Sequence, residues 1–193
     1  VKGDEYYFLY QLVGRGTELI KKLLPGEELG VMGPLGNGFP VEELQGKIAI
    51  VAGGIGIAPF EEVVYKLKEN KKVSCIEVYA GFRREAYGLS NIEKNVHKLT
   101  ITTEDGSLGK RDYVTDDLEL ASYDTVLCCG PEIMMNKVVN MCKELKVQSL
   151  ISTEKRMACG LGACFGCTCK TKNGNKRSCV EGPVFKGEEL ILK

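Results

Sequence analysis

The 193-residue sequence has no net charge, no long apolar run and only one histidine. Lys and Arg together number 26, as do Asp and Glu, so the formal net charge at pH 7 is zero. This balance argues against a general nucleic-acid-binding or membrane-surface role, because both depend on excess positive charge. No stretch is long and apolar enough to span a bilayer. Lys2, Asp4 and Glu5 interrupt the start, so we expect no signal peptide there.

Internal repeats and low-complexity segments are absent as well. The single histidine, His97, falls in an expected loop, and we expect no catalytic acid–base residue in this chain. Nine cysteines cannot all pair in disulfides, and a cytoplasmic location is the natural expectation. Four of the nine lie in apolar strand or helix patterns and are expected to be small core residues, namely Cys75, Cys128, Cys129 and Cys142.

The hydrophobic content of 44% suits a globular core, and the length allows one large domain or two small ones. From residue 46 onward, short apolar strands alternate with helices, which predicts an α/β fold with a doubly wound parallel sheet. The expected strands are 47–52, 73–82, 99–103, 125–129 and 147–152, and the expected helices are 59–69, 89–96 and 131–145, with 113–120 as a further candidate. Asn173-Gly174-Asn175 predicts the turn of a small hairpin after them.

The first 45 residues have a different pattern. Residues 5–13 and 29–32 are rich in strong β-formers and predict two strands. A short helix is expected over 18–24, with Thr17 as its N-cap. This region is too short to close a barrel. We interpret it as the back part of an antiparallel β lobe whose front part is not in this sequence.

One stretch near the C-terminus, from Met157 to Cys167, is rich in cysteine and glycine. Four residues separate Cys159 from Cys164, two separate Cys164 from Cys167, and eleven separate Cys167 from Cys179. This C-x4-C-x2-C…C spacing is typical of a plant-type [2Fe–2S] cluster held by four thiolates. The intervening glycines, Gly160, Gly162 and Gly166, would let backbone N–H groups approach sulfur. The apolar neighbours are expected to limit access of water, namely Leu161, Ala163 and Phe165.

Two other uses of these cysteines stay open. A structural zinc ion could take the same four thiolates, although such sites usually combine two short C-x2-C knuckles and only one occurs here. Disulfides would require an oxidising compartment. Cys169, two residues after Cys167, is interpreted as a spare thiol on the following strand.

Two glycine turns follow expected strands. Gly53-Gly54-Ile55-Gly56 leads into a helix opened by Pro59, and Cys129-Gly130-Pro131 leads into another. Ligands of such sheets bind beyond the carboxyl ends of the strands, and N–H groups at a helix start suit a pyrophosphate. The alternative is a pair of tight strand-to-helix turns. Arg83-Arg84 could meet an adenosine phosphate or form a solvated loop, which leaves the choice of NAD or NADP open.

Five motifs occur in an order that is similar to the ferredoxin-reductase superfamily: Gly16-Thr17, residues 33–39, residues 53–59, residues 129–135 and the four cysteines. The cysteine stretch, with Glu181-Gly182-Pro183-Val184-Phe185 after it, resembles the electron-transfer subunits of B-type dihydroorotate dehydrogenases. The resemblance covers essentially the whole chain. It implies a [2Fe–2S] cluster, FAD and NAD as cofactors and an FMN-containing catalytic partner subunit in a heterotetramer. It also implies transfer of electrons from dihydroorotate to NAD⁺ in de novo pyrimidine (UMP) biosynthesis.

The resemblance also assigns roles to residues. The FAD phosphate would contact Gly16 and Thr17, and the flavin would lie near Gly33, Pro34, Leu35 and Gly36. The NAD site would be lined by Gly53, Gly54, Gly56, Cys129, Gly130 and Pro131. A nicotinamide accepts two electrons as hydride, whereas the cluster moves one electron at a time. FAD can do both and must therefore stand between them.

One departure concerns the flavin. The family's Arg-Pro-x-Ser motif would lie just before residue 1, so we expect this chain alone to bind FAD poorly. The expected domains are a partial flavin lobe over 1–45, an NAD-binding domain over 46–153 and a [2Fe–2S] domain over 154–193. Two alternatives are a subunit of a related ferredoxin:NADP⁺ or sulfide-linked oxidoreductase and a zinc-stabilised, non-catalytic binding module. Cys159 argues against the first, because those subunits often carry aspartate at this position.

Overall fold

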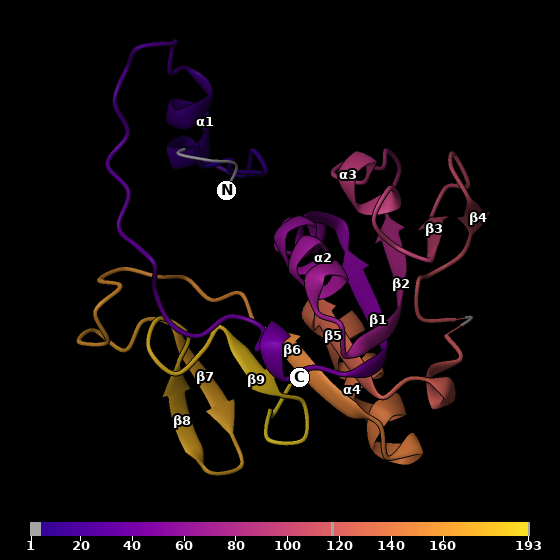
Figure 1. The fold of residues 1–193 in the computed structure, drawn as a ribbon. Coiled ribbons are helices and arrows are strands. Elements are labelled where there is room, and N and C mark those ends of the chain that lie inside the picture. The colour runs from indigo at the N-terminus through magenta and orange to yellow at the C-terminus, as the bar shows by residue number, and fades with distance from the viewer. Residues whose placement is uncertain (1–4, 117, 193) are drawn as a thin grey trace.

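The computed structural model describes residues 5–116 and 118–192. Its main element is a seven-stranded sheet in the order β4-β3-β2-β1-β5-β6-β9 (Figure 1). Neighbouring strands are parallel except β6 and β9, which pair antiparallel. The strands are β1 (Gly46–Gly53), β2 (Val73–Phe82), β3 (Lys98–Thr103), β4 (Lys110–Arg111), β5 (Thr125–Cys129), β6 (Gln148–Ser152) and β9 (Val184–Lys186).

Both faces of this sheet are covered. Ile48 and Ile50 of β1 are fully buried in the core beneath helix α2 (Phe60–Glu69), and the alternate residues Ala49 and Val51 are buried in the core beneath α4 (Glu132–Leu145). Alternation along a strand sends successive side chains to opposite faces, so an apolar run such as β1 must be buried on both. The predicted doubly wound parallel sheet is confirmed.

The C-terminal region contributes to both sheets of the molecule. Strands β7 (Thr168–Thr171) and β8 (Gly174–Arg177) form a two-stranded antiparallel hairpin, as predicted, and Gly174, with a positive φ of 100°, begins β8 directly after the turn. Strand β9 then leaves the hairpin and joins the main sheet at the edge of β6. The sequence pattern did not predict β9, because three residues carry too little periodicity. This strand anchors the cysteine region to the nucleotide-type sheet.

Two helix predictions need correction. Residues 113–120 form turns followed by a short 3₁₀ helix, Leu120–Ser122, and residue 117 lies outside the described residues. Val114 and Leu118 are nevertheless buried against the sheet, so the apolar pattern reports burial of an irregular segment. The helix expected over 89–96 is only α3 (Ser90–Glu93), after which the Asn95 side-chain amide donates to the Asn91 carbonyl, a local bond that competes with helix continuation.

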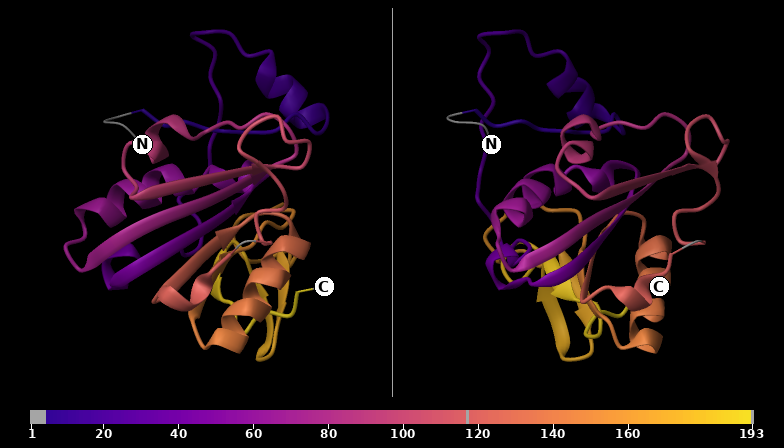
Figure 2. Two further views of the ribbon diagram at one scale, coloured as in Figure 1. Left: turned by 90° about the vertical axis from the view of Figure 1, so that its right-hand side faces the viewer. Right: turned by 45° about the vertical axis from the view of Figure 1, so that its right-hand side comes forward.

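The strands expected over 5–13 and 29–32 are wrong. The described residues 5–45 hold only single bridges, the helix α1 (Arg15–Lys21) and one short 3₁₀ helix, Val41–Glu43. Strand propensity depends on pairing and on burial of one face. Tyr6, Tyr7 and Val13 are 72%, 66% and 77% exposed, so these residues have neither a paired strand nor a buried face. Figures 1 and 2 show α1 on an arm that projects from the body of the protein.

Candidate cofactor sites

The four cysteines predicted to bind iron lie in two pairs. The thiol of Cys164 contributes to a lowered pKa of Cys159, and the thiols of Cys167 and Cys179 shift each other's pKa, so the members of each pair interact. The residues between them form an irregular loop, into which the backbone N–H groups of Leu161 and Gly166 point, each 3.4 Å from a cysteine sulfur. Among the described residues, no three Cys, His, Asp or Glu side chains converge as a ready-made site for one metal ion.

Backbone donors shift the protonation of these thiols. The N–H of Cys164, followed by that of Leu161, lowers the pKa of Cys159 to about 6. The N–H of Cys179 lowers the pKa of Cys167, whereas burial and then the hydrogen bond to Cys167 raise the pKa of Cys179. Each pair therefore contains one thiol that ionises readily. Because the thiolate is the form that binds metal, the loop is prepared for metal ligation.

Glycine is required at two positions of the loop, because other parts of the chain lie too close there to leave room for a side chain. Gly160 and Gly162 have positive φ values of 69° and 79°. A Cβ on Gly160 would come within 3.0 Å of Leu35 and 3.1 Å of Met32, so this glycine lets residues 32–35 lie against the cysteine loop. The expected apolar cover is wrong for this chain, since the neighbouring side chains are all exposed, namely Leu161, Ala163 and Phe165.

The thiol of Cys169 contacts hydroxyl groups. Its side chain is only 2% exposed, and its sulfur lies 3.3 Å from the Thr153 hydroxyl and 3.2 Å from the Ser178 hydroxyl. Its interpretation as a thiol outside the ligand set stays a prediction. The cysteines expected in the core are buried or half-buried, and burial raises the pKa of Cys129 and of Cys142 to about 11. These are neutral thiols that pack.

The segment expected near the flavin lies on the cysteine region. A Cβ on Gly36, whose φ is 65°, would collide with the carbonyl of Gly182. The side-chain amide of Asn37 donates to the Val180 carbonyl at 3.0 Å, and its backbone carbonyl accepts from Val184 at 3.2 Å. Residues 33–37, with Pro34 and Leu35 among them, are therefore held beside the loop that carries Cys179.

The two residues expected at the FAD phosphate are placed elsewhere. Gly16 and Thr17 lie in α1, on the projecting arm (Figure 1). Thr17 is not the N-cap. Gly14 takes that position, and the Thr17 hydroxyl accepts from the N–H groups of Val13 and Gly14 and donates to the Gly14 carbonyl. The structure does not bring these residues together with Gly33–Gly36.

The two glycine turns meet at one edge of the sheet. In the register of β1 and β5, Ala52 lies beside Cys129, so the turns that follow are neighbours. A Cβ on Gly56 would collide with the Cys129 carbonyl, and one on Gly130 would lie 2.9 Å from the Gly53 nitrogen. Backbone thus packs on backbone between these turns, beside the ring of Pro131.

Gly54 differs from the other glycines of its turn. Its φ is 53°, and a Cβ there would have only one neighbour within 4 Å, the Tyr87 hydroxyl at 3.7 Å. Open space therefore lies above Gly54, at the carboxyl edge of the sheet where a nucleotide would bind. Gly53, Gly56 and Gly130 have a packing role, and the absence of a side chain at Gly54 leaves room for a ligand.

The remaining candidate residues, two arginines and a histidine, lie at opposite edges of the main sheet. Arg83 and Arg84 follow β2 at the same edge as the glycine turns and are exposed, and Arg84 lies 3.9 Å from Asp105. His97 precedes β3 at the opposite edge, where its Nδ1 accepts the N–H of Ile76 at 3.0 Å. The His97 side chain therefore serves as a hydrogen-bond acceptor for the backbone of β2.

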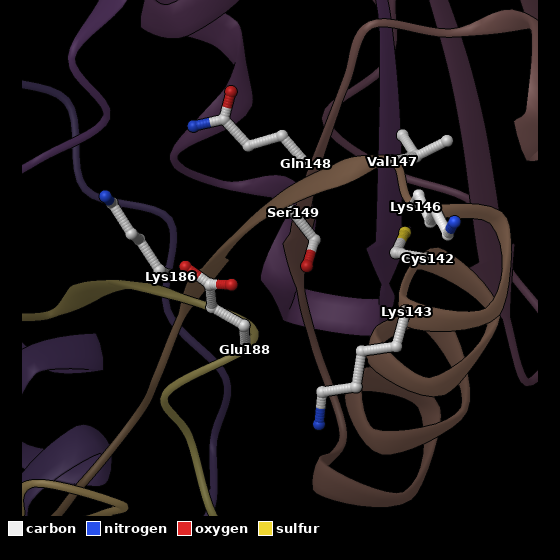
Figure 3. A pocket seen from close by; sticks show the side chains of 8 residues that line it. All are labelled: Cys142, Lys143, Lys146, Val147, Gln148, Ser149, Lys186 and Glu188. Atoms are coloured by element: carbon white, nitrogen blue, oxygen red, sulfur yellow. The ribbon is translucent and has the colours of Figure 1, made fainter.

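A cavity of about 490 Å³ also lies at that opposite edge. It is formed where α4 ends and β6 begins, with three lysines, Lys143, Lys146 and Lys186, among its lining residues (Figure 3). Lysines here complement the negative carboxyl end of α4. The cavity is separate from both the glycine turns and the cysteine loop, and the proposed sites do not involve it.

Sequence reasoning missed one ion pair beside the cysteines. Arg177 and Glu181 flank Cys179, and the hydrogen bond from Arg177 lowers the pKa of Glu181 to about 2. The same hydrogen bond raises the pKa of Arg177, with smaller contributions from the charges of Cys179 and Cys167. The sequence does contain a signal for this ion pair, since the two opposite charges stand four residues apart, one on each side of a candidate ligand.

The nucleotide-type sheet and the cysteine loop together define the class. A search of solved structures found the NADH-dependent reduced ferredoxin-NADP oxidoreductase, at a TM-score of 0.82 and 30% identity over 95% of this chain and 67% of that one. The fold is that of a ferredoxin-reductase-type nucleotide domain that carries an iron–sulfur module. Residues 154–191 match the family model described as the iron–sulfur cluster binding domain of dihydroorotate dehydrogenase B.

Curated relatives narrow the class to a family. The electron transfer subunit of dihydroorotate dehydrogenase B (NAD(+)) from Clostridium acetobutylicum is 56% identical over 98% of this chain and 75% of its own length. The subunit of the same name from Clostridium perfringens is 50% identical over 98% of this chain and 77% of its length. This chain belongs to the family of dihydroorotate dehydrogenase B electron transfer subunits. The resemblance read from its motifs is confirmed.

Proposed function

We propose that Cys159, Cys164, Cys167 and Cys179 hold a [2Fe–2S] cluster through which this chain exchanges electrons between a catalytic partner subunit and NAD⁺. The partner is an FMN-containing dihydroorotate dehydrogenase, and the assembly is a heterotetramer. The observation that carries the proposal is the arrangement of the four thiols in two pairs, each containing a readily ionised thiol. The relatives' name, electron transfer subunit, supports a partner subunit.

The pairing of the thiols fits two metal ions better than one. In a [2Fe–2S] cluster each iron takes two protein ligands, so Cys159 with Cys164 and Cys167 with Cys179 would each serve one iron. A structural zinc ion needs all four thiolates on a single centre. The backbone N–H groups of Leu161 and Gly166 would donate to ligand sulfurs, which orients them and stabilises their negative charge.

The position of the flavin segment supports electron exchange with the cysteine loop. Gly33–Gly36 and Asn37 are bound to residues 180–184, so a flavin held by this segment would lie beside the cluster ligands. The cluster, when bound, supplies one-electron transfer, and FAD links this to two-electron hydride transfer. The role of Gly36 is to allow the close contact with Gly182 that keeps the two segments together.

The nucleotide would bind at the carboxyl edge of β1 and β5. Gly54 leaves the space, and the packed turn from Gly53 to Gly56 against Cys129, Gly130 and Pro131 fixes the backbone below it. The exposed Arg83 and Arg84 lie at the same edge, so selection between NAD and NADP would be decided there. The proposed domains are 1–45, 46–153 and 154–193, with β9 of the last joining the sheet of the second.

The related ferredoxin:NADP⁺-type function is the second candidate. The fold comparison at 30% identity permits it, but relatives at 50–56% identity carry the dihydroorotate dehydrogenase name. Steady-state reduction of NAD⁺ by the complex with its partner separates the two. Dihydroorotate should serve as the electron donor. Activity with reduced ferredoxin alone would support the second candidate.

The visible spectrum tests the cluster itself. The purified protein should be red-brown, should contain about two irons per chain, and should show the paramagnetic resonance signal of a [2Fe–2S] centre after reduction. A colourless protein that contains one zinc ion per chain would overturn the proposal in favour of a zinc-stabilised binding module.

A further inference from the structure

Two oppositely charged side chains flank Cys179 and are bound to each other. The Nε of Arg177 donates to the Glu181 carboxylate at 3.1 Å, and Nη2 donates to its other oxygen. The backbone N–H of Arg177 also donates to this carboxylate, at 2.7 Å. The side chains are 29% and 35% exposed. A two-pronged, half-buried pair of this kind has one fixed geometry, unlike a flexible surface ion pair.

Arg177 also binds the cysteine loop. Its remaining terminal nitrogen, Nη1, donates to the carbonyl of Gly162 at 2.9 Å, and its guanidinium carbon lies 5.4 Å from the centre of the Phe165 ring. A Cβ on Gly162 would come within 3.1 Å of Nη1, so a glycine is needed for this approach. One arginine thus connects the end of β8 to the loop between Cys159 and Cys167.

The carbonyl that Arg177 binds belongs to a peptide unit that faces a ligand. The Gly162 carbonyl and the Ala163 N–H are part of the same peptide, and that N–H faces Cys159 closely enough to contribute to its lowered pKa. The N–H of Gly162, in the preceding peptide, acts to lower the pKa of Cys179. A charged donor on a carbonyl polarises its peptide and strengthens the bond that the N–H makes. Arg177 therefore acts on sulfur through one peptide as well as through its charge.

We propose that Arg177 is a positioning residue that raises the reduction potential of the cluster, and that Glu181 partly offsets this effect. The inference rests on the proposed four-cysteine ligand set. Reduction adds one negative charge to the cluster. A nearby positive charge and stronger N–H···S bonds stabilise that charge, whereas a nearby carboxylate destabilises it. The two side chains must therefore shift the potential in opposite directions when each is neutralised.

The test is the midpoint potential of the cluster, followed by electron paramagnetic resonance in the full chain purified with its partner subunit. Arg177→Gln should lower the potential, and Glu181→Gln should raise it. Arg177→Lys keeps the positive charge but loses the two-pronged hydrogen bonding of the guanidinium group. The midpoint potential of this variant should therefore lie between those of Arg177→Gln and the unchanged protein. A purely structural clamp would change iron content without this ordered series of potentials.

Lys176→Gln is the matched control. Lys176 precedes Arg177 but binds Glu189 at 2.6 Å and lies over the Phe185 ring, so it should leave the potential unchanged. If Arg177→Gln cannot hold iron, Glu181→Gln still tests the sign. A potential that is unchanged or lowered in Glu181→Gln would overturn the inference, as would an iron-loaded Arg177→Gln with the parental potential. Absence of the cluster signal in the unchanged protein would instead overturn the proposed function.

Discussion

At the scale of single residues, Cys169 differs from its neighbours in what surrounds its thiol. It is buried and lies between two hydroxyl groups, those of Thr153 and Ser178, and outside the two thiol pairs. A serine hydroxyl could hydrogen-bond to the same two groups. The spacing of the sequence predicts that Cys169 is not a ligand, and the two neighbouring hydroxyl groups supply a physical reason for its burial.

This difference leads to a prediction for serine replacements. Each of Cys159→Ser, Cys164→Ser, Cys167→Ser and Cys179→Ser should lose most of the cluster, because an alcohol is a far poorer iron ligand than a thiolate. Cys169→Ser should keep it. Iron content and the visible spectrum measure the result. Normal iron in Cys179→Ser together with loss in Cys169→Ser would reverse the assignment.

Gly54 and Gly56 allow ligand binding to be separated from packing. Gly54→Val should place a branched side chain in the open space above the turn and reduce NAD⁺ turnover strongly, while reduction of an artificial dye survives. Gly56→Val should impair both activities, because its Cβ would collide with the Cys129 carbonyl and disturb the fold. Equal loss of both activities in Gly54→Val, with reduced thermal stability, would mean that Gly54 too is structural.

At the scale of elements, β9 links the cysteine region to the main sheet. Phe185 in this strand is 3% exposed and packs in the core beneath α4, against Gly182 on the way from the hairpin. Three residues of antiparallel pairing with β6 would hold weakly by themselves. The buried aromatic ring therefore supplies much of the attachment.

Removal of that ring should be costly. Phe185→Ala is expected to lower the free energy of unfolding by about 3–5 kcal/mol, the usual range for a buried phenylalanine. Phe165→Ala is the control, because that ring is 63% exposed and its loss should change stability little. Thermal or urea unfolding followed by circular dichroism measures both. Similar stability of the two variants would show that β9 does not anchor the cysteine region.

At the scale of the whole molecule, the residues expected to bind the cluster lie close together in the sequence, whereas those expected to bind the flavin lie in separate segments. The four cysteines lie within 21 consecutive residues, Cys159 to Cys179, and are already paired. Gly16 and Thr17 stand on the projecting arm, away from Gly33–Gly36 (Figure 1). A cofactor whose ligands are adjacent in sequence depends little on the rest of the fold, whereas a flavin needs both sides of its site assembled.

The chain as given should therefore contain about two irons and well under one FAD. Acid-extracted flavin and total iron per chain measure these amounts. Stoichiometric FAD in the protein would show that α1 and Gly33–Gly36 do come together when flavin is present.

The sequence alone determined the hairpin, the family and the alternation of strands and helices over 46–152 except at 113–120, because these follow from local periodicity, turn residues and cysteine spacing. It misled over 5–13 and 29–32, since β-formers become strands only when partners and a buried face exist. Only the tertiary structure decided the pairing of the thiols and the role of each glycine. It also decided the attachment of β9 and the contacts of Arg177 with Glu181 and Gly162. The attachment of β9 joins residues distant in the chain, and even the nearer contacts, such as that of Arg177 with Glu181, depend on a loop geometry that no local pattern records.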